Sequence, residues 1–278
     1  LAPADKKLYS IRDIVGTVES LPLITSSILS KKIASGLSSL VLDVKVGNGS
    51  FNSTIDIARD LSNSLVRVAK GAGLHCEAIL TDMNQVLGKS AGHTLEILEC
   101  IKYIKNDFKD HRLEKITNEL ISSLLVNIYK ISKEEAYNKI NTVINNGLAA
   151  EKFEMMVAAL GGPKNILTSY EKDLTNTSIQ KDIFSIESGW IENIHTRELG
   201  LILIELGGGR KQVTDKINYG VGYDNVLNIG DEVNSSTPLL SLYSSKNIDN
   251  NLINKIKGCF IISDKKTQKL SEIFETIN

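Results

Sequence analysis

Ser27 and Lys31 are four residues apart in a segment with helical periodicity, and they are the first side chains whose spacing suggests chemistry. On a helix this spacing places both on one face, whereas Lys32 points away by about 100°. If Arg12 joins them, the three side chains offer several hydrogen-bond donors and one hydroxyl that also accepts. Such a set suits a flat heterocycle with carbonyl oxygens and a ring N–H. The alternative is that Lys31 and Lys32 form a solvated helix end and that Arg12 pairs with Asp13 on the surface.

Two polar segments that follow predicted strands form a second group of candidates. Lys45–Ser50 comes at the end of the apolar run Leu40–Val46, and Thr81–Gln85 follows the apolar run Cys76–Leu80. Open parallel sheets bind ligands just outside the carboxyl ends of their strands, which is where both segments would lie. The glycines of the Gly-Asn-Gly triplet would let the backbone approach a ligand, and the same triplet is equally consistent with an ordinary turn.

The elements that must position these residues can be predicted from periodicity. Residues 1–36 predict two short helices with a turn between them, the second with Ser20 as its N-cap and Gly36 as its stop. Between the two predicted strands, residues 54–72 carry apolar side chains at helical spacing. Strand, helix and strand in this order predict a right-handed βαβ unit in a parallel sheet.

The rest of the chain predicts a helical block followed by short strands. The block extends from Thr94 to about Leu160 and closes at Gly161-Gly162-Pro163. From Ile183 onward turn residues separate short segments, and we expect a final helix over residues 265–277. The short strands are expected at Trp190–Ile191, Val213–Thr214, Val226–Asn228 and Leu239–Leu242.

Composition excludes several broad classes of protein. The 278 residues suggest one large domain or two, and the formal net charge of -1 provides no broad attraction to nucleic acid or to an anionic membrane. Hydrophobic residues make up 42% and charged residues 23%, so a folded globule is expected rather than a disordered chain. No apolar run approaches the roughly 18 residues that cross a bilayer, and the first residues lack a signal-peptide core. We therefore expect a cytoplasmic protein that binds neither membrane nor nucleic acid.

Metal and nucleophile motifs are missing from the sequence. The three cysteines are widely scattered without a C-x-x-C pair, and the four histidines have neither H-x-x-x-H nor H-x-E spacing. There is no nucleophile elbow and no Walker loop. Gly207–Arg210 superficially resembles a phosphate cradle, but it lies among short predicted strands, so a loop is expected there.

Several further motifs follow one another along the chain: Leu1–Lys6, Leu8–Asp13, Ser20–Lys32, Leu42–Gly47, Leu80–Gly88, Met156–Ala159 and Gly207–Arg210. In this order they resemble the thymidine phosphorylase and pyrimidine-nucleoside phosphorylase family. The match extends over essentially the whole chain, and Thr81–Gln85 favours the thymidine branch.

The resemblance implies reversible phosphorolysis of thymidine to thymine and 2-deoxy-α-D-ribose 1-phosphate, with phosphate as co-substrate. It implies that Arg12, Ser27 and Lys31 hold the pyrimidine ring. Arg12 and Lys31 are the expected catalytic cations, because breaking the glycosidic bond places negative charge on the departing base. Other residues implied for the base pocket are Tyr9, Val18 and Ile24.

The family resemblance also implies one possible ion. Some members bind a monovalent cation such as potassium through main-chain oxygens and one carboxylate. The matching positions here are Leu87, Ser90 and Glu99. No other cofactor is expected.

Family architecture supplies the expected fold class. It is α/β, with a mixed sheet flanked by helices, part of a small all-helical domain at the N-terminus, and a β-rich α+β C-terminal lobe. Residues 1–35 match the returning part of the small base-binding and dimerisation domain, 36–175 the large α/β domain, and 176–278 the C-terminal lobe. Because the family dimerises through its small domain, a homodimer is expected.

One family motif has no equivalent in this chain. The Lys-His-Ser-Thr-Gly-Gly type phosphate loop precedes the matched region in the family and occurs nowhere in these 278 residues. Roughly the first third of the usual protein is absent, so we expect a fragment that is inactive alone. Two alternatives remain: a pyrimidine-nucleoside phosphorylase that also accepts uridine, and a noncatalytic binding or scaffold remnant.

Overall fold

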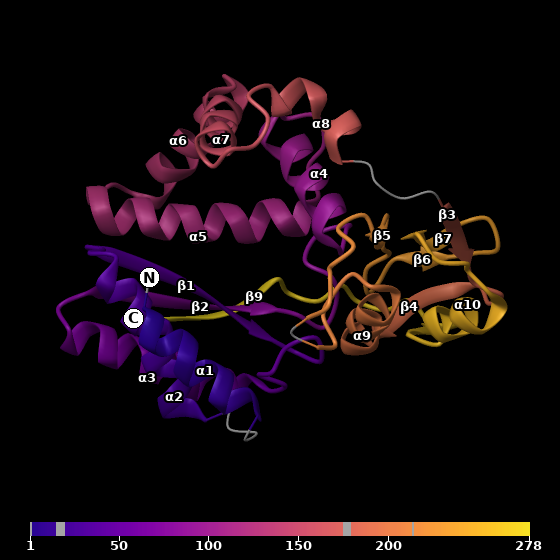
Figure 1. Cartoon of the computed structure of the whole chain (residues 1–278), viewed down its shortest axis with the longest axis horizontal. Helices are drawn as coiled ribbons and strands as arrows, with labels where there is room; N and C mark the ends of the chain where they lie inside the picture. The colour runs from indigo at the N-terminus through magenta and orange to yellow at the C-terminus, as the bar shows by residue number, and fades with distance from the viewer. Residues whose placement is uncertain (1, 15–19, 175–178, 213) are drawn as a thin grey trace. The chain divides into compact units, whose positions relative to one another are not determined.

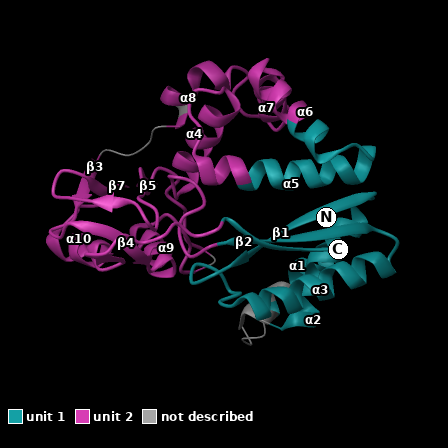
Figure 2. Ribbon diagram, turned by 180° about the vertical axis from the view of Figure 1, so that it is seen from behind, with its two compact units in different colours: residues 1–82, 116–137, 272–278 teal, residues 83–115, 138–271 magenta. Residues whose placement is uncertain are grey.

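The computed structural model describes residues 2–14, 20–174, 179–212 and 214–278 (Figure 1). The chain divides into two compact units, coloured separately in Figure 2. Unit 1 comprises residues 1–82, 116–137 and 272–278, and unit 2 comprises residues 83–115 and 138–271. Among the described residues, no helix combines the length and apolar character that spanning a membrane requires.

Unit 1 contains a mixed sheet in the order β1-β2-β9. β1 (Ser39–Val46) and β2 (His75–Asp82) are parallel, and α3 (Ile55–Gly71) connects them. Thr54 caps α3, because its hydroxyl accepts a hydrogen bond from the Ile57 N–H. The predicted βαβ unit is therefore confirmed.

The two faces of this sheet differ sharply in polarity. On one face, apolar side chains of both strands pack with the apolar stripe of α3. The residues of that core are Leu40, Val44, Val46, Ala58, Leu61, Leu65, Val66, Ala69, Leu74, Cys76, Ala78 and Leu80, with Leu29 of α2. Because successive strand residues alternate in direction, the opposite face carries Asp43, Lys45, Glu77 and Thr81.

A long helix covers part of the polar face. α5 (His111–Tyr129) contributes Ser123 and Asn127, which donate hydrogen bonds to the buried Glu77 carboxylate at 3.2 and 2.9 Å. The sheet is thus flanked by helices on both faces within unit 1, as the expected fold class requires.

The N-terminal residues form α1 (Pro3–Ile14) and α2 (Leu21–Ala34). α2 begins after Ser20, whose side chain makes no capping hydrogen bond, and it ends before Gly36, which has a φ of 69°. A hydrogen bond links α2 to α3, because the hydroxyl of Thr25 lies 2.9 Å from that of Ser64 in α3. These helices confirm the all-helical N-terminal portion.

The helix expected over residues 265–277 was a wrong prediction. Its second half is β9 (Ile273–Ile277), which pairs antiparallel with β2, Ile277 opposite Ala78. The spacing of Ile273 and Ile277 fits a helix, but the second edge of β2 provides backbone partners that local periodicity cannot reveal.

Residues 93–174 are mostly helical. The helices up to residue 159 were expected, whereas the last one, α8 (Ile166–Leu174), was not predicted. The others are α4 (His93–Ile104), α5, α6 (Lys133–Asn145) and α7 (Leu148–Ala159).

Two small sheets and two helices form the C-terminal lobe of unit 2. The sheets have the orders β3-β7-β5 and β6-β4-β8. Their core includes Tyr223, which is fully buried and donates its hydroxyl proton to the Leu199 carbonyl at 3.1 Å. The elements are β3 (Ile179–Phe184), β4 (Gly189–Ile194), α9 (Thr196–Leu206), β5 (Gly222–Asp224), β6 (Glu232–Val233), β7 (Pro238–Ser244), α10 (Asn250–Lys257) and β8 (Phe260–Ser263).

Two of the four short strands were predicted correctly, at Trp190–Ile191 and Leu239–Leu242. Val226–Asn228 is irregular instead, because Asn225 has a φ of 53° and turns the chain immediately after β5. Thr214 lies in a turn, and Val213 lies outside the described residues. The α/β class with a β-rich C-terminal lobe is confirmed, whereas the division at residues 35 and 175 stays a prediction.

Candidate functional site

The structure brings Ser27 and Lys31 together on α2. Lys31 Nζ donates to Ser27 Oγ at 2.9 Å, and Ser27 is only 6% exposed. One turn of helix separates the two residues, so this contact follows from the spacing that predicted it.

A third member of this cluster, Asp5 of α1, was missed from the sequence. Its Oδ2 atom lies 2.6 Å from Lys31 Nζ. The side chain of Asp5 is 14% exposed and that of Lys31 is 41% exposed, so the lysine side chain is partly open to solvent while the aspartate is largely covered. An ammonium has three N–H donors, and these two contacts use two of them. Asp5 therefore orients Lys31 and leaves one donor for a ligand.

Three of the expected base-pocket residues fall outside the described part of the chain. These are the side chains of Arg12 and Tyr9, and all of Val18. Ile24 lies one turn before Ser27 and packs against the hydrophobic core of unit 1. The convergence of Arg12 with Ser27 and Lys31 stays a prediction.

The possible cation ligands lie in the turn before α4 and on α4 itself. Glu99 accepts hydrogen bonds from the main-chain N–H groups of Lys89 at 2.7 Å and Ser90 at 3.1 Å, and also from the Ser90 hydroxyl. Burial raises the pKa of Glu99, and these hydrogen bonds partly offset the effect. A Cβ at Gly88 would collide with this carboxylate, so the turn and Glu99 fit closely.

The donor set at this turn is compatible with an alkali cation. Hydroxyl, carboxylate and main-chain carbonyl oxygens are the hard ligands that such ions take, and Leu87, Ser90 and Glu99 supply them. In the described ranges, this turn included, no group of three histidine, cysteine or acidic residues is placed to hold a metal ion. The cation site stays a prediction.

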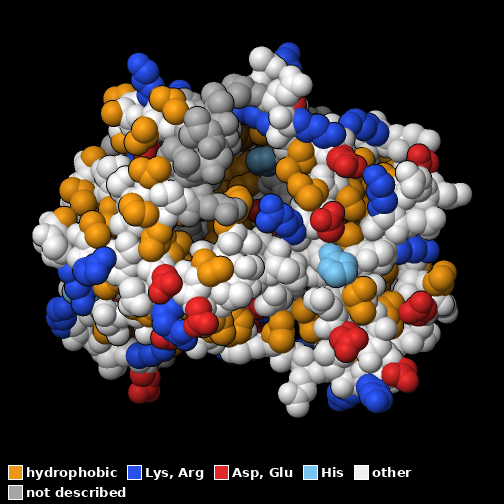
Figure 3. All heavy atoms as spheres, turned by 90° about the horizontal axis from the view of Figure 1, so that it is seen from below, with side chains coloured by type: hydrophobic (Ala, Val, Ile, Leu, Met, Phe, Trp, Pro, Cys, Tyr) orange, Lys and Arg blue, Asp and Glu red, His pale blue; other side chains and the backbone are white. Residues whose placement is uncertain are grey.

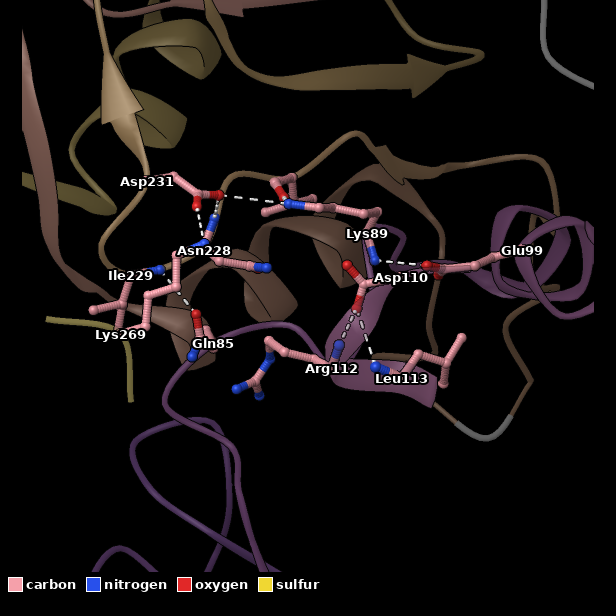
Figure 4. A network of polar contacts seen from close by, with 11 residues as sticks. Gln85, Lys89, Glu99, Asp110, Arg112, Leu113, Asn228, Ile229, Asp231 and Lys269 are labelled. Carbon is pink, nitrogen blue, oxygen red and sulfur yellow. Dashed lines mark hydrogen bonds and ion pairs between the residues drawn. The ribbon is translucent and has the colours of Figure 1, made fainter. Parts of the chain in front are cut away.

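Gln85 and the Gly207–Arg210 segment have structural roles. Gln85 is 1% exposed, and its Oε1 atom accepts a hydrogen bond from the Ile229 N–H at 2.8 Å (Figure 4). Gly207 ends α9 with a φ of 103°, and the Gly208 N–H donates to the Leu203 carbonyl at 2.8 Å. The Gly207–Arg210 segment is thus a helix C-terminus and a loop, as expected, and not a phosphate cradle at a helix N-terminus.

Two models of known protein families match two separate ranges of the chain. Residues 1–150 match the family model described as the glycosyl transferase family, a/b domain. The chain belongs to this glycosyl transferase family. Residues 190–263 match a second family model, the pyrimidine nucleoside phosphorylase C-terminal domain. The predicted resemblance to the thymidine phosphorylase and pyrimidine-nucleoside phosphorylase family is thereby confirmed.

One curated relative is the thymidine phosphorylase of Colwellia psychrerythraea strain 34H. It is 46% identical over 245 residues, which cover 88% of this chain and 56% of the relative. The chain thus spans about half the length of that relative. Asp5, Ser27 and Lys31, which we call the α2 cluster, lie within the range that matches the glycosyl transferase model. The possible cation ligands lie within the same range.

Within the pyrimidine nucleoside phosphorylase C-terminal domain, Asp231 holds a conspicuous polar network (Figure 4). It accepts a hydrogen bond from the Asn228 N–H at 2.9 Å, and its carboxylate lies 3.5 Å from Lys89 Nζ and 3.1 Å from Lys269 Nζ. Burial alone would raise the pKa of Asp231, but the Asn228 N–H and the two ammonium groups outweigh it and hold the pKa below its usual value.

This network predicts a pH-dependent loss in an Asp231→Asn variant. A carboxyl with a lowered folded-state pKa adds stability above its unfolded pKa of about 3.9, and that stability is lost as the pH falls through the folded-state value. We expect the variant to be about 1–2 kcal/mol less stable at pH 7 and as stable as the unchanged chain below the lowered pKa. Urea unfolding at stepped pH measures this, with the exposed Asp264→Asn as control. A loss of equal size at every pH would contradict it.

Proposed function

We propose that this chain is part of a pentosyltransferase that catalyses the reversible phosphorolysis of thymidine to thymine and 2-deoxy-α-D-ribose 1-phosphate. The observation that carries the proposal is the Lys31 ammonium, held between Asp5 and Ser27 within the glycosyl transferase match. The 46% identity to a curated thymidine phosphorylase supports the choice of substrate.

The α2 cluster is suited to stabilise a departing pyrimidine. Cleavage of the glycosidic bond leaves negative charge on the base, and that charge spreads to the carbonyl oxygens. The remaining Lys31 N–H, together with the Ser27 hydroxyl and the expected guanidinium of Arg12, would donate to those atoms. Because the charge grows only as the bond breaks, these donors stabilise the transition state more than bound thymidine.

Asp5 has a supporting role in this proposal. A lysine side chain loses considerable rotamer freedom when it is fixed, and the 2.6 Å ion pair fixes it before the base arrives. Asp5 is therefore a positioning residue, while Lys31 and Arg12 are the proposed catalytic residues.

Phosphate is the nucleophile, and this chain lacks the family's phosphate-loop motif. We therefore expect no thymine release by the 278-residue chain alone. A monovalent cation, if bound, would be held by Leu87, Ser90 and Glu99 and would brace the turn before α4. No step of the proposed reaction passes through it. A cytoplasmic location stays a prediction.

A homodimer is part of the proposal, because α1 and α2 expose apolar side chains. Leu8 is 45% exposed, Ile11 50% and Ile33 44%, and large exposed apolar side chains that gather on one surface are typical of interaction sites. Exposed hydrophobic side chains also appear between charged ones on the face drawn in Figure 3. We expect sedimentation equilibrium to give twice the chain mass, and Ile11→Asp to give a monomer. A monomeric unchanged chain would contradict the proposal.

The decisive test of the function is binding of the base. We expect calorimetry to detect thymine binding by the chain, and a phosphorolysis assay to detect turnover only when the chain is extended by a segment that carries the family's phosphate-loop motif. Comparing thymidine with uridine in that assay separates a thymidine phosphorylase from one that also accepts uridine. Absence of thymine binding would favour a noncatalytic remnant and defeat the proposal.

A further inference from the structure

The carboxyl ends of β1 and β2 carry a charged cluster that the proposed function does not use. Lys45 Nζ lies 2.7 Å from Asp43 Oδ2 and donates to Thr81 Oγ1 at 3.0 Å. Thr81 in turn donates its hydroxyl proton to Asp43 Oδ1 at 2.5 Å. Each of the three side chains contacts the other two, so the cluster is closed on itself.

The strand register explains why these residues meet. Lys45 is paired with Thr81 across the parallel ladder, and Asp43 precedes Lys45 by two residues and so points to the same face. On the other face of the same strands, Leu40, Val44, Val46, Cys76, Ala78 and Leu80 pack in the apolar core with α3. Half-buried ion pairs add little net stability, because removing both charges from water offsets their attraction. Strand stability alone therefore does not account for this cluster.

The main chain at Lys45 is also held in place. Its carbonyl accepts hydrogen bonds from Ser50 Oγ at 2.8 Å and Asn52 Nδ2 at 3.1 Å. The Gly47 N–H donates to the Asn52 carbonyl at 3.0 Å, which folds the following loop back onto the strand end. Such support from surrounding groups is what a binding residue requires.

The exposed part of the cluster defines its ligand chemistry. Thr81 is fully buried, whereas the side chains of Lys45 and Asp43 are 26% and 23% exposed. Lys45 has a third N–H that the contacts to Asp43 and Thr81 do not use, and the Asp43 carboxylate has further lone pairs. A ligand oxygen at this position would meet a donor and an acceptor side by side.

We propose that the Asp43–Lys45 pair binds a hydroxyl group of a sugar. A hydroxyl accepts from the ammonium and donates to the carboxylate at the same time, so it satisfies both groups. A phosphate dianion satisfies only Lys45, and Asp43 repels it from nearly the same distance. The electroneutral pair thus favours a hydroxyl over an anion.

The position of the pair agrees with a ligand site, since open parallel sheets bind ligands outside the carboxyl ends of their strands. The identification of the sugar as the pentose of the nucleoside rests on the proposed function, whereas the hydroxyl chemistry of the pair does not.

Nuclear magnetic resonance titration of the 278-residue chain tests the inference with free 2-deoxyribose, inorganic phosphate and thymine as separate probes. We expect 2-deoxyribose to shift the amides of residues 43–50 and 81 saturably. Lys45→Met should abolish the shifts, and Asp43→Asn should weaken binding about tenfold, the equivalent of one charged hydrogen bond. Lys133→Met is the matched control, because it removes an ion pair of 2.6 Å with Glu119 elsewhere in unit 1.

Every result of these titrations either supports or overturns the proposed hydroxyl site. Unshifted amides with 2-deoxyribose, or equal shifts in the Lys45→Met and Lys133→Met variants, would overturn the inference, and saturation by phosphate at similar affinity would replace the hydroxyl site with an anion site. If both variants at the pair unfold, the location of the shifts in the unchanged chain decides instead. Thymine binding without 2-deoxyribose binding overturns only this inference. The reverse result overturns the proposed base site and leaves the hydroxyl site standing.

Discussion

Thymine binding by a Lys31→Met variant is expected to be about 10- to 100-fold weaker than binding by the unchanged chain. A hydrogen bond from a charged donor contributes about 1.5–3 kcal/mol, and each 1.4 kcal/mol changes a dissociation constant tenfold. Methionine retains most of the aliphatic side chain, so the change removes the ammonium and little packing. Isothermal titration calorimetry with thymine measures the effect directly.

Two further variants show whether a loss of affinity comes from a direct contact between Lys31 and thymine or only from the overall charge of the helix. Lys32→Met removes the adjacent charge from the same helix but about 100° away, and its affinity for thymine should stay unchanged. Asp5→Asn keeps the side-chain shape but removes the ion pair with Lys31. Its affinity should fall by less than that of Lys31→Met, because the ammonium remains but is less well oriented. Equal losses in the Lys31 and Lys32 variants would mean that only the overall charge matters, and would contradict the site.

α3 and the two strands that it connects could be predicted because their determinants are local. Residues 54–72 were expected to be helical, and α3 extends over Ile55–Gly71 with its apolar stripe buried. The two strands around it are short apolar runs that end in turn residues. In each case the residues that decide the structure lie within the element itself.

The C-terminal strand could not be predicted in this way. β9 forms because β2 offers unpaired backbone groups, as in the hydrogen bond from the Asp82 N–H to the Glu272 carbonyl at 3.0 Å. The partner lies about 190 residues upstream, and no pattern within residues 265–277 reports it. Tertiary pairing here overrides the helical spacing of the apolar residues.

The same distinction applies to the candidate site. Ser27 and Lys31 share one helix, so their spacing predicted that they lie on one face, and the structure shows them in contact. Asp5 comes from a different helix, 26 residues before Lys31, and only the packing of α1 with α2 brings it there. Within the sequence, Asp5 is one acidic residue in the first turn of a helix, and a favourable interaction with the helix dipole is enough to explain such a residue.

Gly92→Ala is expected to destabilise the chain by about 3–5 kcal/mol, because two costs fall on one residue. Gly92 has a φ of 120° and a ψ of 143°, which side chains with a Cβ rarely adopt. A Cβ there would also lie 2.5 Å from the Val221 carbonyl oxygen and 2.7 Å from the Gly222 Cα. The neighbouring backbone cannot easily retreat, since Ala91 and Tyr223 exchange two hydrogen bonds of 3.0 and 2.7 Å.

Substitutions at two other glycines separate the cost of the positive φ from the cost of the steric collision. Gly147 has a φ of 82°, and a Cβ added there would meet nothing within 4 Å, so Gly147→Ala should lose only the conformational part, about 1–2 kcal/mol. Gly200 lies within α9 with the same open space and no positive φ, so Gly200→Ala should gain about 0.5–1 kcal/mol. Chemical denaturation of the three variants measures the order. A contrary result would be that Gly92→Ala lowers the free energy of unfolding by no more than Gly147→Ala does. The backbone contact between residues 91–92 and 221–223 would then adjust to the added Cβ at little cost, and the turn that carries Ser90 would not be rigidly held.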